Sequence, residues 1–143
     1  MSSFKVFDIA GSGMSAESVR LNTVASNLAN ADSASGDPTQ VYQAKHPVFQ
    51  TVQALGAAAS RTAEQASASV KVLGIAANQA APEARYDPSN PLANSEGYVY
   101  SSNVNVVEEM TDMISASRSY QNNVEVMNTA RNLMLDTLKL GQS

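Results

Sequence analysis

The sequence predicts a mainly α fold in which long, coiled-coil-like N- and C-terminal helices pack together around a small, irregular, β-containing middle segment. Three observations lead to it: apolar residues recur every seven positions near both ends, proline and glycine interrupt the middle, and only 15% of the 143 residues are charged. A globular chain usually has about a quarter, so we expect this surface to contact other protein. We divide the chain into an N-terminal helix (1–31), a middle segment (32–103) and a C-terminal helix (104–143).

The first helix is expected from about residue 4 to residue 31. Its apolar stripe is narrow, as in helices that pack against one other helix. The stripe consists of Phe7, Met14, Leu21 and Leu28. Gly11 and Gly13 each cost about 1 kcal/mol in helix propensity. Either they allow another helix to approach closely, or they break the helix.

The middle segment is interpreted as turns, short strands and a loop. Strands are expected within residues 41–52, within residues 69–75 and at residues 98–100. Pro47 lacks an amide hydrogen, so it places the first strand at a sheet edge. The Ala- and Ser-rich residues 54–68 are expected to form a flexible loop outside the helical assembly, with a short, weak helix as the alternative.

The last helix, expected from about residue 106 to residue 140, gives the strongest periodic signal. A large apolar or aromatic residue recurs every seven positions and forms the stripe. Three of the positions that lie four residues after a stripe residue are also apolar, and we call these the companion positions. The stripe is Val106, Met113, Tyr120, Met127 and Met134, with Met110, Val124 and Leu138 as companions. Asn105 is predicted to cap this helix and Gly141 to end it. At ~1.5 Å per residue the helix is roughly 50 Å long. We take the stripes of both helices as the candidate assembly interface.

The residue inventory gives no support for catalysis. There is no cysteine and one histidine, His46, which argues against thiolate chemistry and against Cys- or His-rich metal sites. Nine scattered basic residues and a net charge of −4 argue against a nucleic-acid partner. Glu108, Glu109 and Asp112 lie at a helix start, where the helix dipole explains them. We therefore predict no enzyme activity, no cofactor, no metal and no small-molecule substrate.

Several motifs resemble those of flagellar axial proteins, the family of rod, hook and hook-associated subunits. The Asn-Leu-Ala-Asn run that closes the first helix is similar to the N-terminal signature of that family. The run from residue 103 to residue 120 resembles, more narrowly, the proximal rod subunits of the flagellar basal body. The residues that carry the likeness are Asn27, Leu28, Ala29, Asn30, Glu109, Met110, Arg118 and Tyr120.

Two positions depart from the family pattern near the start of the last helix. Asn90 stands where the family commonly has histidine, and Ser102 stands where it usually has proline. Proline fixes the backbone, so its replacement predicts a looser turn into the helix.

The resemblance implies a subunit that polymerises through its terminal helices into a hollow, periplasm-spanning rod. Such a rod transmits torque from motor to hook. Its subunits are exported through the flagellar type III apparatus, and their termini are disordered in the monomer. The implied partners are copies of the chain, other rod subunits, the inner-membrane ring and the export apparatus. Two alternatives stay open on the sequence: another flagellar axial subunit, or a soluble helical adaptor or secretion chaperone.

Overall fold

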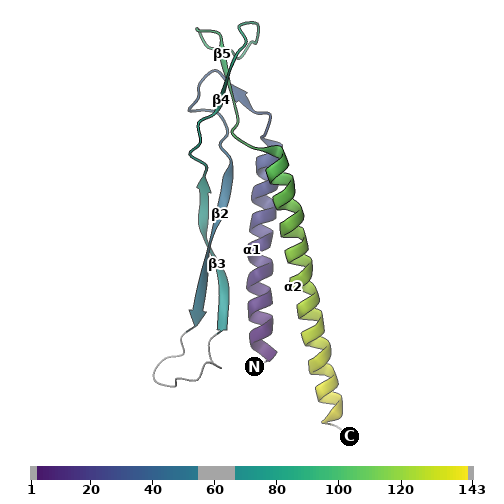
Figure 1. The fold of residues 1–143 in the computed structure, drawn as a ribbon. Helices are drawn as coiled ribbons and strands as arrows, with labels where there is room; N and C mark the ends of the chain where they lie inside the picture. Colours follow the sequence, from purple (N-terminus) through teal and green to yellow (C-terminus); the bar gives the residue numbers. More distant parts are fainter. Residues whose placement is uncertain (1–2, 55–66, 142–143) are drawn as a thin grey trace.

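The computed structural model describes residues 3–54 and 67–141. Two antiparallel helices, α1 (Ser3–Ala29) and α2 (Val106–Leu140), lie side by side along an elongated molecule (Figure 1). The prediction of two long terminal helices with a β-containing segment between them is confirmed. Strands occupy more of the middle than expected, so "mainly α" describes the fold only roughly.

α1 continues without a break through both of its central glycines, so the predicted alternative of a broken helix is wrong. The two glycines differ in what surrounds them. A Cβ at Gly13 would lie 2.8 Å from Nδ2 of Asn123 on α2, whereas a Cβ at Gly11 would meet nothing within 4 Å. Close approach of the helices therefore explains Gly13 and does not explain Gly11.

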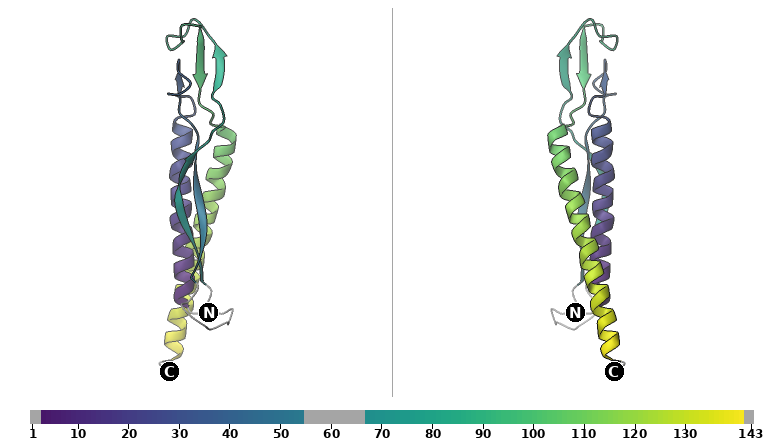
Figure 2. Two further views of the ribbon diagram at one scale, coloured as in Figure 1. Left: turned by 90° about the vertical axis from the view of Figure 1, so that its left-hand side faces the viewer. Right: turned by 90° about the vertical axis from the view of Figure 1, so that its right-hand side faces the viewer.

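α2 begins and ends where the sequence predicts. The side chain of Asn105 accepts hydrogen bonds from the amides of Val107 (3.1 Å) and Glu108 (3.4 Å). The helix ends before Gly141, whose amide donates to the carbonyl of Thr137 at 3.2 Å. Figure 2 shows that α2 crosses α1 and that its C-terminal end extends beyond the first turn of α1.

A long two-stranded hairpin lies along α1. It is formed by β2 (Lys45–Ala54) and β3 (Ser67–Ala77), which pair antiparallel, with a bulge that leaves Leu73 without a partner residue. The two strands predicted here are confirmed with other bounds: β2 begins and ends later than the predicted residues 41–52, and β3 extends past residues 69–75 at both ends. Because this sheet has two strands, β2 is a sheet edge, as expected from Pro47.

The predicted loop over residues 54–68 needs a correction at its ends. Ala54, Ser67 and Ala68 belong to the paired strands of the hairpin. The remaining part of that prediction, residues 55–66, lies outside the described residues.

A second, smaller sheet lies at the end of the molecule away from both termini (Figure 1). Its antiparallel strands are β1 (Ala34–Ser35), β4 (Glu83–Tyr86) and β5 (Tyr98–Ser101), in the order β1-β5-β4. The sequence predicted only β5. The other two strands have two and four residues, which is too short for an alternation of apolar and polar positions to be recognised.

Gly97 shapes the turn that leads into β5. Its φ of +81° lies in the left-handed region that favours glycine. A Cβ there would also come within 2.9 Å of the Tyr86 ring. That ring packs edge-to-face against Tyr98, with the two centroids 5.3 Å apart. Glycine is therefore required at this position for both conformation and space.

Both positions that depart from the family pattern make hydrogen bonds, Ser102 just before α2 and Asn90 in the connection between β4 and β5. The Ser102 amide donates to the carbonyl of Ser33 at 3.0 Å, a bond that proline cannot make. The Asn90 side chain accepts from the amide of Leu92 at 3.0 Å. The Ser102 bond offsets some of the rigidity that proline would give, and a looser turn stays a prediction.

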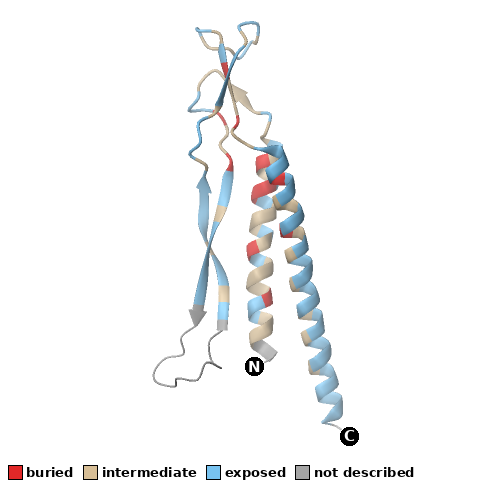
Figure 3. Ribbon diagram, in the orientation of Figure 1, coloured by how far each residue is buried: buried red, intermediate tan, exposed pale blue. Residues whose placement is uncertain are grey.

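The core is made of small side chains. Among the described residues, the buried apolar ones are four alanines and three valines, and they gather along α1 and near its junction with the sheets (Figure 3). They are Ala10, Ala16, Val24, Val41, Ala44, Val99 and Ala116. Most large apolar side chains of α2 lie outside this core.

Candidate assembly interface

The apolar stripe of α1 is already partly covered within the single chain. α1 lies between α2 and the β2–β3 hairpin, as Figure 1 shows. All four stripe residues, Phe7, Met14, Leu21 and Leu28, are half-buried. Two neighbours of the stripe, Ala10 and Val24, are buried. The α1 stripe therefore contributes to the fold of the subunit itself.

The face of α2 that packs on α1 is not the predicted apolar stripe. It is a row of small or polar residues spaced by seven, of which two are buried and two half-buried: Glu109, Ala116, Asn123 and Ala130. Sequence reasoning missed this row because it searched for large apolar residues. The helices approach closely because little side chain separates them.

The predicted stripe of α2 lies beside this row and is covered only in part. Met113, Met127 and Met134 are half-buried, whereas Val106 and Tyr120 are exposed. The companion positions are more exposed still: Met110 is 54% exposed, Val124 36% and Leu138 63%. The outer face of α2 therefore carries large apolar side chains that the subunit leaves in water.

Asn27 ties three elements together at the junction of the helices. Its Nδ2 donates to the carbonyl of Lys45 and to Oε1 of Glu109, both at 2.8 Å. Its Oδ1 accepts from the Lys45 amide at 2.9 Å and from the Tyr42 hydroxyl at 3.0 Å. The side chain is fully buried, and these four bonds satisfy it completely. Asn27 thereby fixes the end of α1 to the start of β2 and to the first turn of α2.

Two family descriptions match the chain at its two ends. "Flagella basal body rod protein" matches residues 7–36, which hold most of α1 together with β1. "Flagellar basal body rod FlgEFG protein C-terminal" matches residues 95–140, which hold β5 and α2.

Curated relatives match over the whole length. The flagellar basal-body rod protein FlgC of Salmonella typhimurium is 51% identical over 142 residues, covering 99% of this chain and 100% of the relative. The proteins of the same name from Yersinia enterocolitica and from Buchnera aphidicola of Acyrthosiphon pisum are 50% and 40% identical, with the same coverage.

The chain belongs to the flagellar basal-body rod protein family. It is a structural component of the rod, which spans the periplasm, and not an enzyme. The adaptor and chaperone alternative is therefore excluded.

Two of the residues that suggested this family from the sequence meet in the rod protein's structure: Asn27 and Glu109. The structure brings no other signature residue into this junction. Leu28 is half-buried, and Asn30 donates to the Ser26 carbonyl at 2.8 Å. The others are exposed: Ala29, Met110, Arg118 and Tyr120.

Glu109 is the one strongly buried carboxylate among the described residues of the rod protein. Burial raises its pKa, which the hydrogen bond from Asn27 and the nearby His46 partly oppose, while Asp112 and Glu108 add to the rise. Its Oε2 has no hydrogen-bond partner among the described residues. Sequence reasoning assigned Glu109 to the helix dipole, since a single sequence holds no signal for the pairing with Asn27.

Within the described residues of the rod protein, no group of three or more His, Cys, Asp or Glu side chains is placed to hold a metal ion. No helix there is long and apolar enough to span a membrane.

Proposed function

We propose that this rod protein polymerises into a hollow rod by packing the outer face of α2 against neighbouring subunits. The predicted coiled-coil-like packing of the terminal helices then occurs between copies as well as within one. The partners are copies of the chain and other rod subunits. At the base of the rod, we propose contacts with the inner-membrane ring and passage through the flagellar type III export apparatus.

The exposed apolar face of α2 is the observation that carries this proposal. Large apolar residues remain exposed on both flanks of α2. Val106, Val107, Met110, Ile114, Tyr120, Val124, Leu135 and Leu138 lie on the side of the stripe and its companions, and Val126, Leu133 and Leu140 lie on the flank of Asp112. A soluble monomer rarely leaves so extended an apolar surface in water. Fully burying one Met, Val or Leu side chain contributes about 1.5–3 kcal/mol, so covering this face provides a large driving force for assembly.

The small core supports a second part of the proposal, that assembly completes folding. Ordering the backbone costs roughly 1–2 kcal/mol of conformational free energy per residue. This cost applies to the 27 residues of α1 and to the 35 residues of α2. Burial of alanine and valine side chains offsets little of that cost, because these side chains remove little apolar surface from water. The helices are therefore proposed to be largely disordered in the free subunit and stable only when neighbours cover them. A disordered chain is also easily threaded during export.

The proposal is tested by a matched pair of substitutions on α2. Met127 is half-buried on the stripe, and Asn128 is the exposed residue beside it. Met127→Asp places a charge where a neighbour packs and should abolish rod growth and swimming. Asn128→Asp carries the same charge off the stripe and should swim normally. Swimming at the wild-type level by the Met127 variant, with normal basal bodies in electron micrographs, would contradict the assignment of the stripe.

A further inference from the structure

A groove runs along α1 between β2 and α2. It consists of two adjoining hollows of about 210 Å³ and 320 Å³, which share Phe49 as a lining residue. The floor is α1, from Gly13 to Val24. The first hollow is walled mainly by the hairpin, and the second is closed on the other side by Asp112 of α2. The floor therefore combines the small or apolar residues Gly13, Ala16 and Val24 with the charged residues Glu17 and Arg20.

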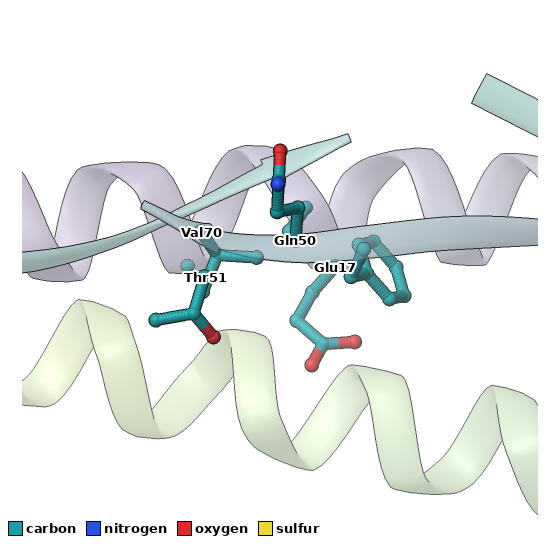
Figure 4. Close-up of a pocket in the computed structure, with 7 residues that line it drawn as sticks. Glu17, Gln50, Thr51 and Val70 are labelled. Atoms are coloured by element: carbon teal, nitrogen blue, oxygen red, sulfur yellow. The ribbon is translucent and has the colours of Figure 1, made fainter. Parts of the chain in front are cut away.

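Glu17 gives the groove an unsatisfied acceptor. Its Oε2 is buried and accepts no hydrogen bond among the described residues. The nearest cation is Nη1 of Arg20 at 3.9 Å, beyond hydrogen-bond distance, and Nη2 of that arginine is bonded to Asp112 at 2.8 Å. Figure 4 shows the Glu17 carboxylate and Thr51 extending toward α2, while Gln50 extends from the other side of β2. The Glu17 side chain as a whole is 20% exposed and lines the hollow, so a donor that enters the groove comes next to this carboxylate.

The complementary feature lies on the far flank of α2. The row of companion positions continues at its C-terminal end as Val124, Arg131 and Leu138, a cation between two apolar residues, all three exposed. Arg131 makes no ion pair or hydrogen bond with the part of the chain that the structure describes. From the helical period, this row and Asp112 lie on opposite flanks of the α2 face that contacts α1. The row of Val124, Arg131 and Leu138 therefore faces away from the groove of its own subunit.

We propose that this groove receives the C-terminal turns of α2 from a second copy of the chain, with Arg131 of that copy paired to Glu17. The inference rests on the proposed polymerisation and names its contact surface. A groove and its complement on opposite flanks of one molecule form a heterologous contact, which repeats from copy to copy and builds a ring or a helical filament. Glu17 has only the 3.9 Å ion pair with Arg20, and Arg131 has no partner among the described residues, so their pairing would give both a direct charge-assisted hydrogen bond.

The pairing also sets the stagger between neighbours. Within one subunit, Gly13 lies opposite Asn123, so Glu17 lies roughly at the level of residue 119. If Arg131 of the neighbour lies at the level of Glu17, the neighbouring subunit is shifted along the helix axis by about 12 residues, or roughly 18 Å. In that position Leu135 of the neighbour comes level with Gly13, close to Thr51 on the groove wall.

A charge exchange tests the pairing in swimming cells. Glu17→Arg and Arg131→Glu should each greatly reduce the number of swimming cells, because each leaves two like charges facing in the contact. The double variant, which exchanges the two charges, should restore swimming at least in part. Arg118→Glu is the control, because Arg118 also lies on α2 but outside this row. Adding Glu17→Arg to the Arg118→Glu variant should not improve its swimming. Normal swimming by both single variants would overturn the pairing.

Disulfide trapping in purified rods is the second and independent measurement. The chain has no cysteine, so Thr51→Cys with Leu135→Cys introduces the only two thiols. Oxidised rods of this double variant should contain covalent dimers and longer multimers, which the two single-cysteine variants should lack. Rods that assemble and yield no multimers overturn the groove contact while leaving polymerisation itself intact. If the double variant forms no rods, Phe49→Cys with Leu135→Cys is the fallback, since Phe49 lines both hollows of the groove and lies on the same face of β2 as Thr51.

Discussion

The junction around Asn27 shows how one polar residue can organise a small core. Each of its four hydrogen bonds contributes about 1 kcal/mol net, but removing the side chain leaves several buried groups without partners, which costs more. Among these groups are the backbone of Lys45 and the carboxylate of Glu109. The sequence predicts that Asn27 lies near a helix end, and it does. Its contacts depend on residues 18 and 82 positions away, which no local pattern encodes.

Glu109 makes the stability of the assembled rod depend on pH. Burial raises its pKa above the ordinary value of 4.5, so the folded subunit binds this proton more tightly than the unfolded chain does. Its contribution to stability is therefore greatest below the unfolded pKa and is lost as the pH rises through the folded pKa. Glu109→Gln keeps an oxygen for Asn27 and removes the charge, so it should make the rod more stable at neutral pH.

The measurement is the midpoint of urea-induced dissociation of purified rods at several pH values. Other carboxylates also titrate, so the informative quantity is the difference between wild type and variant. The advantage of Glu109→Gln should grow as the pH rises above 4.5. The same change at the exposed neighbouring Glu108 should give no such trend. A constant difference at every pH would show that Glu109 does not carry this dependence.

At the scale of elements, the approach of α1 to α2 depends on one glycine rather than two. Gly13→Leu places a side chain where Asn123 lies, so the helices must separate or repack; overpacking of this kind costs about 1–3 kcal/mol. Gly11→Leu meets open space within the subunit and gains helix propensity of up to about 1 kcal/mol.

The two glycine variants are compared by the yield of complete basal bodies and by swimming speed. Gly13→Leu should reduce both, and Gly11→Leu should leave both close to wild type. The opposite order would mean that the contact of α1 that matters in the rod is with another subunit, at Gly11.

The helices were predictable because their signals are local and repeated. Thirty-five residues with a seven-residue period, an Asn cap and a closing Gly fix α2 almost to the residue. The paired strands of the hairpin were recognisable from their β-branched residues, although their bounds were set by pairing with each other. The partner of each α2 face was not predictable, because the face that contacts α1 is built of Glu109, Ala116, Asn123 and Ala130, and small or polar residues give no hydrophobic signal.

For the whole molecule, the distribution of side chains separates what folds the subunit from what assembles it. The small end sheet contains Val99, which is 1% exposed and the largest fully buried apolar residue among those described. The turn before β5 is fixed by Gly97 and by the Tyr98 amide, which donates to Oδ1 of Asn94. Asn103, which follows β5, accepts from the Ala44 amide and donates to the Ala80 carbonyl. The helices, by contrast, bury mostly alanine and leave their larger residues exposed. We therefore expect the end sheet, rather than the helices, to keep some structure in the free subunit.

Amide hydrogen exchange on the dilute monomer, compared with assembled rods, tests this division most directly. In the monomer, residues 4–31 and 106–140 should exchange almost as fast as an unfolded chain, while some amides within 69–103 are protected. In rods, both terminal segments should become strongly protected, because neighbours then cover the apolar face of α2. Strong protection of both terminal segments in a proven monomer would contradict the central claim that assembly completes the folding of this subunit.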